Sequence, residues 1–256
     1  MKEALFEFNE SKKFISPYIS STVGSFENEV SYLSSNSFKK LETLCKRCGG
    51  CFYPVDNRKT SLNFHPSEDF SLLQSFDLIS KSRPYCIFII GDTYGPFCDE
   101  FSIDEKNLDN DVNDVTIVKR NLKTAISHGH SWLSEKPFCN ASLLELEIEF
   151  AALQNGSSLS RSHCHFYFHD KYNVFLTEAE RKDVKSSNDS IESSEGQEKL
   201  SNLKDRLIDD GYNVRFFHDE KSLDDAVLED WSNIINLQFE KEVDESLIGK
   251  IIILLF

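Results

Sequence analysis

The chain alternates between short apolar segments and longer stretches in which apolar residues recur every three or four positions. Such alternation is typical of strands followed by amphipathic helices. The apolar segments lie at 14–19 (FISPYI), 51–55 (CFYPV), 85–91 (YCIFIIG), 163–170 (HCHFYFHD) and 212–217 (YNVRFF). The third segment is apolar throughout and is bounded by Pro84 and Gly91, which favours a strand buried on both faces.

The stretches between these segments predict amphipathic helices. They cover residues about 25–48, with an interruption around 34–37, then 72–79, about 115–127, 142–153, 200–207 and 223–235. Gly49 and Gly211 are expected to end two of the helices, because glycine adopts the left-handed conformation without steric cost. Ser142 and Glu145 have the spacing of a capping box at the start of another.

Five strands that alternate with helices predict the α/β class. The strands should form a parallel sheet, with right-handed crossovers and helices on both faces. Ligands or partners of such a sheet bind at the carboxyl ends of its strands.

Changes in composition along the chain predict its domain organisation. We expect a single domain over 14–240, with an acidic insertion at 97–134 and a polar linker at 171–197, between tails at 1–13 and 241–256. The final GKIIILLF has two interpretations that the sequence leaves open, the truncated edge of a longer protein and a buried strand.

The charge of the chain and its lack of targeting signals argue against several classes of partner and location. The 256 residues carry a formal net charge of -15, which disfavours binding to nucleic acid and to anionic membranes. The charged start lacks the apolar core of a signal peptide, and no apolar run reaches about 18 residues. A cytoplasmic protein is therefore expected, in which the seven cysteines stay reduced.

The cysteine-rich stretch CKRCGGC, residues 45–51, suggests either a metal site or packing by free thiols. A zinc or iron-sulfur site needs four convergent ligands, usually in two separated pairs. Since Cys45 and Cys48 lie at a helix end and Cys51 opens a strand, small apolar packing is the favoured interpretation.

Six segments carry a resemblance: YISST (18–22), GGCFYPVD (49–56), SRPYCIFIIGDTYG (82–95), SLLELEIEFAAL (142–153), FYFHD (166–170) and VLEDWSNII (227–235). In this order they resemble the TIR-like domain family, also called DUF4062. The resemblance spans about 14–240, and its most specific parts are the SRPY…GDTYG block and the SLLELEI helix. The family's FRDM and LRWG motifs are replaced here by VGSF at 23–26 and NRKT at 57–60, so charged strand-end residues are lost.

The resemblance implies a flavodoxin-like three-layer fold with strand order 2-1-3-4-5. Such domains stand N-terminally in NACHT proteins with TPR or WD repeats, such as nephrocystin-3, the telomerase-associated WD-repeat protein and tetratricopeptide-repeat relatives. The implied function is a non-catalytic interaction module of a scaffold or signalling protein. Its expected partners are proteins, and self-association is left open. The chain has no G-x-x-x-x-G-K-[ST] phosphate loop of its own.

An enzymatic alternative rests on Glu145. TIR domains that hydrolyse NAD carry a glutamate early on the helix after the third strand, and Glu145 resembles it in position. The opposing interpretation is that Glu145 only completes the capping box. The resemblance implies ligand-binding positions at Ser20, Ser21, Thr22, Asp56, Arg58, Asp92, Tyr94 and Gly95. NAD would be a substrate, and neither a cofactor nor a metal is expected.

A further alternative, a metal-dependent hydrolase, would use Asp56, Asp92 and Asp170. Aspartates after strands, Asp219 included, more often cap the following turn. Arg58 and Arg83 are the cations expected near these carboxylates. The histidines at 163, 165 and 169 share one face of the predicted strand, yet they are spaced too widely to chelate one ion, and a structural role is favoured.

Overall fold

The computed structural model describes residues 14–21, 26–56, 72–98, 114–154, 158–170 and 193–254, with the backbone alone from 240 onward. The chain divides into two compact units. The first unit comprises Met1–Ser16, Asn28–Pro54 and Asp219–Phe256, and the second comprises Pro17–Glu27 and Val55–His218.

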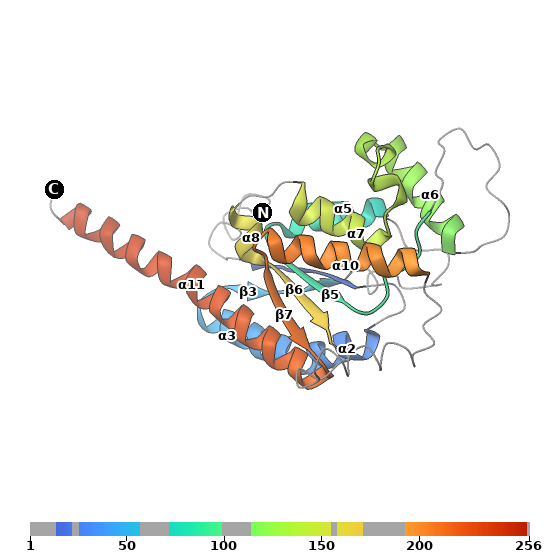
Figure 1. Ribbon diagram of the computed structural model, residues 1–256. Coiled ribbons are helices and arrows are strands. Elements are labelled where there is room, and N and C mark those ends of the chain that lie inside the picture. Colours follow the sequence, from blue (N-terminus) through green and yellow to red (C-terminus); the bar gives the residue numbers. More distant parts are fainter. Residues whose placement is uncertain are drawn as a thin grey trace, which may run out of the picture. The chain divides into compact units, whose positions relative to one another are not determined.

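The second unit contains a five-stranded sheet in the order β4-β2-β5-β6-β7 (Figure 1). Its strands are β2 (Tyr18–Ser21), β4 (Val55–Asp56), β5 (Cys86–Ile90), β6 (Cys164–His169) and β7 (Asn213–Phe217). Every neighbouring pair is parallel. The α/β class and the parallel five-stranded sheet predicted from the sequence are therefore confirmed.

The two strands in the middle of the sheet, β5 and β6, are almost entirely buried and mostly apolar. Cys86 lies opposite Cys164 and Ile90 opposite Phe168. In this register, paired residues of the two strands point to the same face of the sheet. Phe88 stacks on Phe166 with ring centroids 5.1 Å apart. Such aromatic pairs across strands add to the stabilisation from burial.

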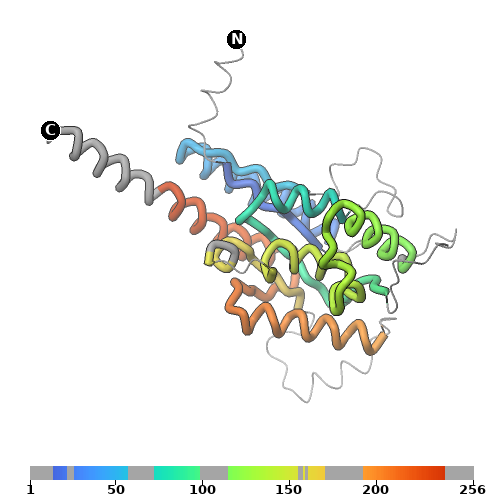
Figure 2. Tube along the Cα trace, turned by 90° about the horizontal axis from the view of Figure 1, so that it is seen from above, coloured from blue at the N-terminus to red at the C-terminus, as the bar shows by residue number. Residues whose placement is uncertain are grey.

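One face of this sheet is covered by helices of the same unit (Figure 1). The helical segments of the unit are α5 (Leu72–Ser82), α6 (Asp114–Ser127), η1 (Ser131–Ser134), η2 (Phe138–Asn140), α7 (Leu143–Ile148), the π-helical turn η3 (Glu149–Leu153), α8 (Ser158–His163) and α10 (Ser194–Asp209). α10 buries a stripe of leucines, Leu200, Leu203 and Leu207, and lies beside α7 in both views (Figure 1, Figure 2).

The first unit pairs two short parallel strands, β1 (Phe14–Ile15) and β3 (Cys51–Phe52). Its helices include α3 (Ser37–Arg47) and α11 (Glu220–Leu254), and α2 (Glu27–Ser35) leads into α3. α3 lies along α11, where the N–H of Ser37 donates to Asp224 Oδ1 at 2.9 Å (Figure 1). The ring of Phe52 contacts Trp231, with centroids 6.0 Å apart.

Most predicted elements are found, with three differences. The interruption near 34–37 is the boundary between α2 and α3. The predicted strand at 51–55 is divided into β3 and β4, with Tyr53 and Pro54 between them. Of the two interpretations of GKIIILLF, the buried strand does not hold for the described residues, since the helical backbone of α11 continues to Leu254.

Several predictions are not decided by these elements. The single domain over 14–240, the flavodoxin-like assignment and the helices on both faces stay predictions. The tail at 1–13, Thr22, Arg58, most of the acidic insertion (99–113) and most of the polar linker (171–192) lie outside the described residues. A search of the described helices finds none with the length and apolar content to cross a membrane.

Candidate functional site

The candidate site lies at the carboxyl ends of β5 and β6, where the loop 91–98 leaves the sheet toward α7. Tyr94, in this loop, is only 1% exposed. Glu145, in the first turn of α7, has a side chain that is 13% exposed. The geometry of the site therefore depends on how the loop and the helix are joined.

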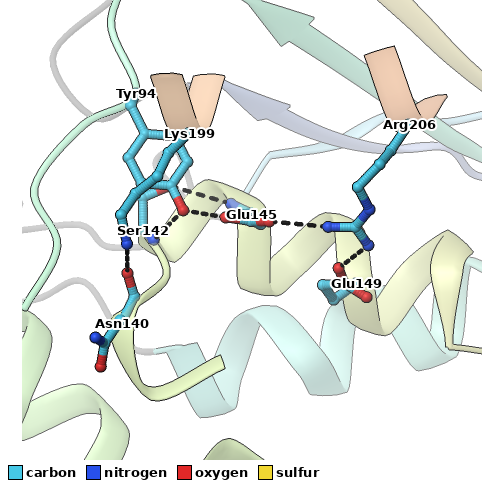
Figure 3. A network of polar contacts seen from close by, with 7 residues as sticks. All are labelled: Tyr94, Asn140, Ser142, Glu145, Glu149, Lys199 and Arg206. Atoms are coloured by element: carbon cyan, nitrogen blue, oxygen red, sulfur yellow. Dashed lines mark hydrogen bonds and ion pairs between the residues drawn. The ribbon is translucent and has the colours of Figure 1, made fainter. Parts of the chain in front are cut away.

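Tyr94 joins the loop to the start of α7 (Figure 3). Its hydroxyl accepts from the N–H of Ser142 at 3.2 Å and donates to Glu145 Oε2. Ser142 Oγ in turn accepts from the N–H of Glu145 at 3.3 Å. In an ordinary capping box the glutamate side chain reaches back to the cap N–H. Here the hydroxyl of Tyr94 stands between these two groups.

Arg206 of α10 binds two carboxylates at once (Figure 3). Its Nη1 donates to Glu145 Oε1 at 3.2 Å, and its Nη2 donates to Glu149 Oε1. Glu149, the first residue of η3, has a side chain that is only 5% exposed, whereas that of Arg206 is 44% exposed. The planar guanidinium suits this double contact, which a lysine ammonium would not reproduce.

The pKa values follow from this burial. Burial raises the pKa of Glu145, although Tyr94 and Arg206 both favour its charged form. Burial and the neighbouring Glu145 carboxylate raise the pKa of Tyr94, which is therefore a neutral donor. Burial alone would lower the pKa of Arg206, but its contacts with Glu149 and Glu145 raise it overall.

Two lysines of α10 bind backbone carbonyls around the same loop. Lys199 Nζ donates to the carbonyl of Asn140 at 2.9 Å, and Lys204 Nζ donates to that of Gly91 at 2.8 Å. Burial lowers the pKa of Lys204, against the opposing influence of Asp92 and Asp170. We call Lys199, Lys204 and Arg206 the α10 clamp, because one helix supplies all three cations.

Phe26 covers the carboxyl end of β5. Its φ of 62° lies in the left-handed region, which is costly for a bulky side chain. The ring lies so close to Gly91 that a Cβ built there would be 2.8 Å from it. It also contacts His169 and Phe217, with ring centroids 5.7 and 5.8 Å away. An aromatic ring thus occupies the edge at which ligands of parallel sheets bind.

A third buried carboxylate, that of Glu147, faces β2 rather than α10. Glu147 is 2% exposed, and it accepts from Tyr18 Oη at 2.9 Å and from Ser20 Oγ. Burial, followed by the charge of Glu147, raises the pKa of Tyr18 well above its usual value. Ser20 therefore contributes to a buried contact between β2 and α7.

The chain is similar to three curated proteins in alignments of 239 residues that cover 88% of this chain. These are the putative tetratricopeptide repeat protein 41 of Homo sapiens, 31% identical, and tetratricopeptide repeat protein 41 of Rattus norvegicus and of Mus musculus, each 30% identical. The matched region spans about 18% of the length of each. No protein-family model matches the chain, and no solved structure is significantly similar to it.

The structure brings together only some of the predicted site residues. Tyr94 and Glu145 are in direct contact. Asp92 lies 3.6 Å from Nδ1 of His169, and Gly95 adopts a φ of 86°. Ser21 and Asp56 are buried at 8% and 7% exposure.

Other predictions about individual side chains need correction. Arg83 precedes β5 and so lies at the amino edge, where its guanidinium donates to the carbonyl of Phe150. His163 ends α8 instead of lying in the strand. Cys45 is buried as expected for a packing thiol, but Cys48 is exposed.

The metal-hydrolase alternative finds no support in the described part of the chain. No group of three or more His, Cys, Asp or Glu side chains there could hold a metal ion. Asp219 instead caps the following helix, since its Oδ1 accepts from the N–H of Ser222 at 2.7 Å. The cap predicted for an aspartate after a strand is confirmed at this position.

A cavity of about 610 Å³ lies apart from the predicted site residues, and none of them lines it. Its walls are formed by α5 together with His130 and Phe150. Burial lowers the pKa of His130, so its ring is neutral at neutral pH.

The residues missed by sequence reasoning are the α10 clamp, Glu147, Glu149 and Phe26. A signal for the clamp exists, because Lys199, Lys204 and Arg206 flank the leucine stripe of α10. A cation next to a buried stripe is placed to reach over the edge of the core. Which carbonyls and carboxylates it meets depends on helix packing, which the spacing does not show.

Replacing Arg206 by alanine should lower the free energy of unfolding by about 2 kcal/mol, because Glu145 and Glu149 lose a charged hydrogen-bond partner. Urea denaturation measures this change. The matched control is Lys81→Ala, which breaks an exposed ion pair with Asp77 and should cost less than about 0.5 kcal/mol. Equal losses in the two variants would contradict the assigned role of Arg206.

Glu145→Gln should change how stability depends on pH. Because the pKa of Glu145 is raised on folding, its contribution is present below the unfolded pKa and is lost as the pH rises through the folded value. Glutamine does not titrate. From about pH 4 to about pH 7 the variant should therefore gain stability relative to the native protein. Urea unfolding of both proteins across this range tests the sign, and a shift in favour of the native protein would refute it.

Proposed function

We propose that the chain is a TIR-like domain with the flavodoxin-like arrangement. Counted along the chain, the observed order β4-β2-β5-β6-β7 corresponds to 2-1-3-4-5, the order that the resemblance implies. The block SRPYCIFIIGDTYG supplies β5 and the loop with Tyr94, and SLLELEI supplies the cap and α7. The most specific parts of the resemblance thus coincide with the candidate site.

We propose further that this domain is a non-catalytic protein-interaction module. The observation that carries this proposal is the engagement of Glu145, whose two carboxylate oxygens contact Tyr94 and Arg206. A carboxylate that holds ribose hydroxyls must offer its oxygens to the substrate. Phe26, packed against Gly91, supports the same conclusion, because it occupies the neighbouring edge of the sheet.

The similarity to much longer relatives supports the proposal that the chain works as one domain of a longer protein. Their names state tetratricopeptide repeats, and repeats of this kind build extended surfaces for binding other proteins. We propose by analogy that the chain serves a repeat-type or NACHT-type scaffold or signalling protein in the cytoplasm. Its partners are proteins, further copies of the chain included, and the function requires no cofactor.

The interaction role is tested at Thr93, an exposed residue of the loop between β5 and α7. Thr93→Arg should abolish capture of a specific partner by the tagged chain, because a long cation is placed in the proposed contact. The matched control is Thr124→Arg, the same change at an exposed position of α6, which should leave capture intact. Quantitative mass spectrometry of the captured proteins compares the variants. The proposal is contradicted if no captured protein is lost with Thr93→Arg and retained with Thr124→Arg.

An NAD glycohydrolase is the second candidate, and one observation favours it. Tyr94 and Glu145, which the resemblance placed in one pocket, are hydrogen-bonded at the carboxyl end of β5. If Arg206 were displaced, Glu145 Oε1 would be available to a ribose hydroxyl. The carboxylate could then stabilise an oxocarbenium-like transition state.

Incubation with NAD separates the two candidates. The native chain should release no nicotinamide above the rate without protein, and Arg206→Ala should release none either, because the proposed function involves no catalysis. Chromatography of the reaction measures the release, with Glu145→Ala as the control for adventitious activity. Release by the native chain that disappears in Glu145→Ala would establish the second candidate instead.

A further inference from the structure

The turn between α3 and β3 brings three cysteines into one short loop. The helix ends with Gly49 at a φ of 84°, and the N–H of Gly50 donates to the carbonyl of Cys45 at 2.9 Å. The N–H of Cys48 donates to the same carbonyl at 3.1 Å. Cys51 then begins β3 and pairs with Phe14 of β1. The reversal at Gly49 and Gly50 therefore places a thiol on each side of the turn.

The three thiols differ in exposure. Cys45 is buried, Cys48 is exposed and Cys51 is intermediate. The remaining cysteines at positions 86, 98, 139 and 164 are buried. Packing explains a buried thiol, but it does not explain an exposed cysteine three positions from a half-buried one.

Electrostatic interactions agree that the thiols are neighbours. Burial, with smaller contributions from Cys51 and Cys48, raises the pKa of Cys45 to about 11. The pKa of Lys46 is raised chiefly by its hydrogen bond with Glu42, and Cys51 adds to the shift. Lys46, in the last turn of α3, therefore lies near Cys51 as well.

We propose that Cys48 and Cys51 form a reversible redox pair, which low-molecular-weight disulfides of the glutathione type oxidise to an intramolecular disulfide. No established or proposed activity of the chain requires this site. The pair closes the sequence Cys48-Gly49-Gly50-Cys51, and its two glycines give the backbone the freedom that a four-residue disulfide loop needs.

The chemistry balances in two exchange steps. The exposed Cys48 thiolate attacks one sulfur of the small disulfide, so that a mixed disulfide forms and one small thiol leaves. The Cys51 thiolate then attacks Cys48 Sγ, and the second small thiol leaves. Overall, two protein thiols are oxidised to one disulfide, and one small disulfide is reduced to two thiols, with the two protons passing to the departing thiolates.

Cys45 is excluded from the pair by the same observations. It is fully buried, and its raised pKa keeps it protonated at neutral pH, so it neither receives the small disulfide nor attacks a mixed disulfide efficiently. The exposed Cys48 is the entry thiol, and Cys51 is the resolving one. Closure would covalently fix the end of α3 to the start of β3.

The test uses the complete chain in glutathione buffers of increasing oxidised fraction, with alkylation of free thiols and trypsin digestion. Cleavage after Lys46 and Arg47 leaves Cys45 in the peptide 41–46 and places Cys48 and Cys51 together in the peptide 48–58. The peptide 48–58 should lose two hydrogens and take up no alkyl group, whereas the peptide 41–46 should remain alkylated. Half-oxidation of the native chain should need about tenfold less oxidant than that of the urea-denatured chain.

Two variants complete the test. Cys48→Ser should abolish the internal disulfide, and Cys139→Ser, a change at a buried cysteine elsewhere, should leave it unchanged. A disulfide that joins the peptides 41–46 and 48–58 would overturn the assignment of the pair. Failure of the peptide 48–58 to oxidise more readily in the folded chain than in the denatured chain would overturn the proposal as a whole.

Discussion

The arrangement of the second unit around its sheet edge depends on one guanidinium between two buried carboxylates. Arg206 holds Glu145 and Glu149, which are nearly excluded from solvent, together with α10. Two carboxylates so close would repel each other, and each would pay the cost of leaving water. With the cation between them, the start of α7 and the turn η3 are both held against α10.

This interaction also shapes the functional argument. Tyr94 brings the loop after β5 to the same carboxylate, and Lys204 binds the carbonyl of Gly91 at the base of that loop. Tyr94 and Glu145, on which the enzymatic alternative rests, thus both make contacts within the unit. The same loop also contains an exposed residue, Thr93.

The pattern of the chain predicts its elements well, because each depends on local periodicity. β5 is recognisable from a run of five buried residues, and the cap of α7 from the spacing of Ser142 and Glu145. The contacts of the site are harder to predict, since they join residues far apart in the sequence. Arg206 meets Glu145 across 61 positions, and Tyr18 meets Glu147 across 129. The sequence shows that these charges exist, but only the packing of helices on the sheet determines their partners.

The wide turn η3 has a consequence of its own. In a π-helical turn the backbone bond skips one residue further than in an α-helix, as in the bond from Gln154 N–H to the carbonyl of Glu149. Carbonyls there become available to outside donors, and Arg83 takes that of Phe150 while Tyr212 takes that of Ala152. Loss of a single residue from this turn would rotate the following backbone by about 100°. An insertion or deletion at this point would therefore displace both of these contacts at the amino edge of the sheet.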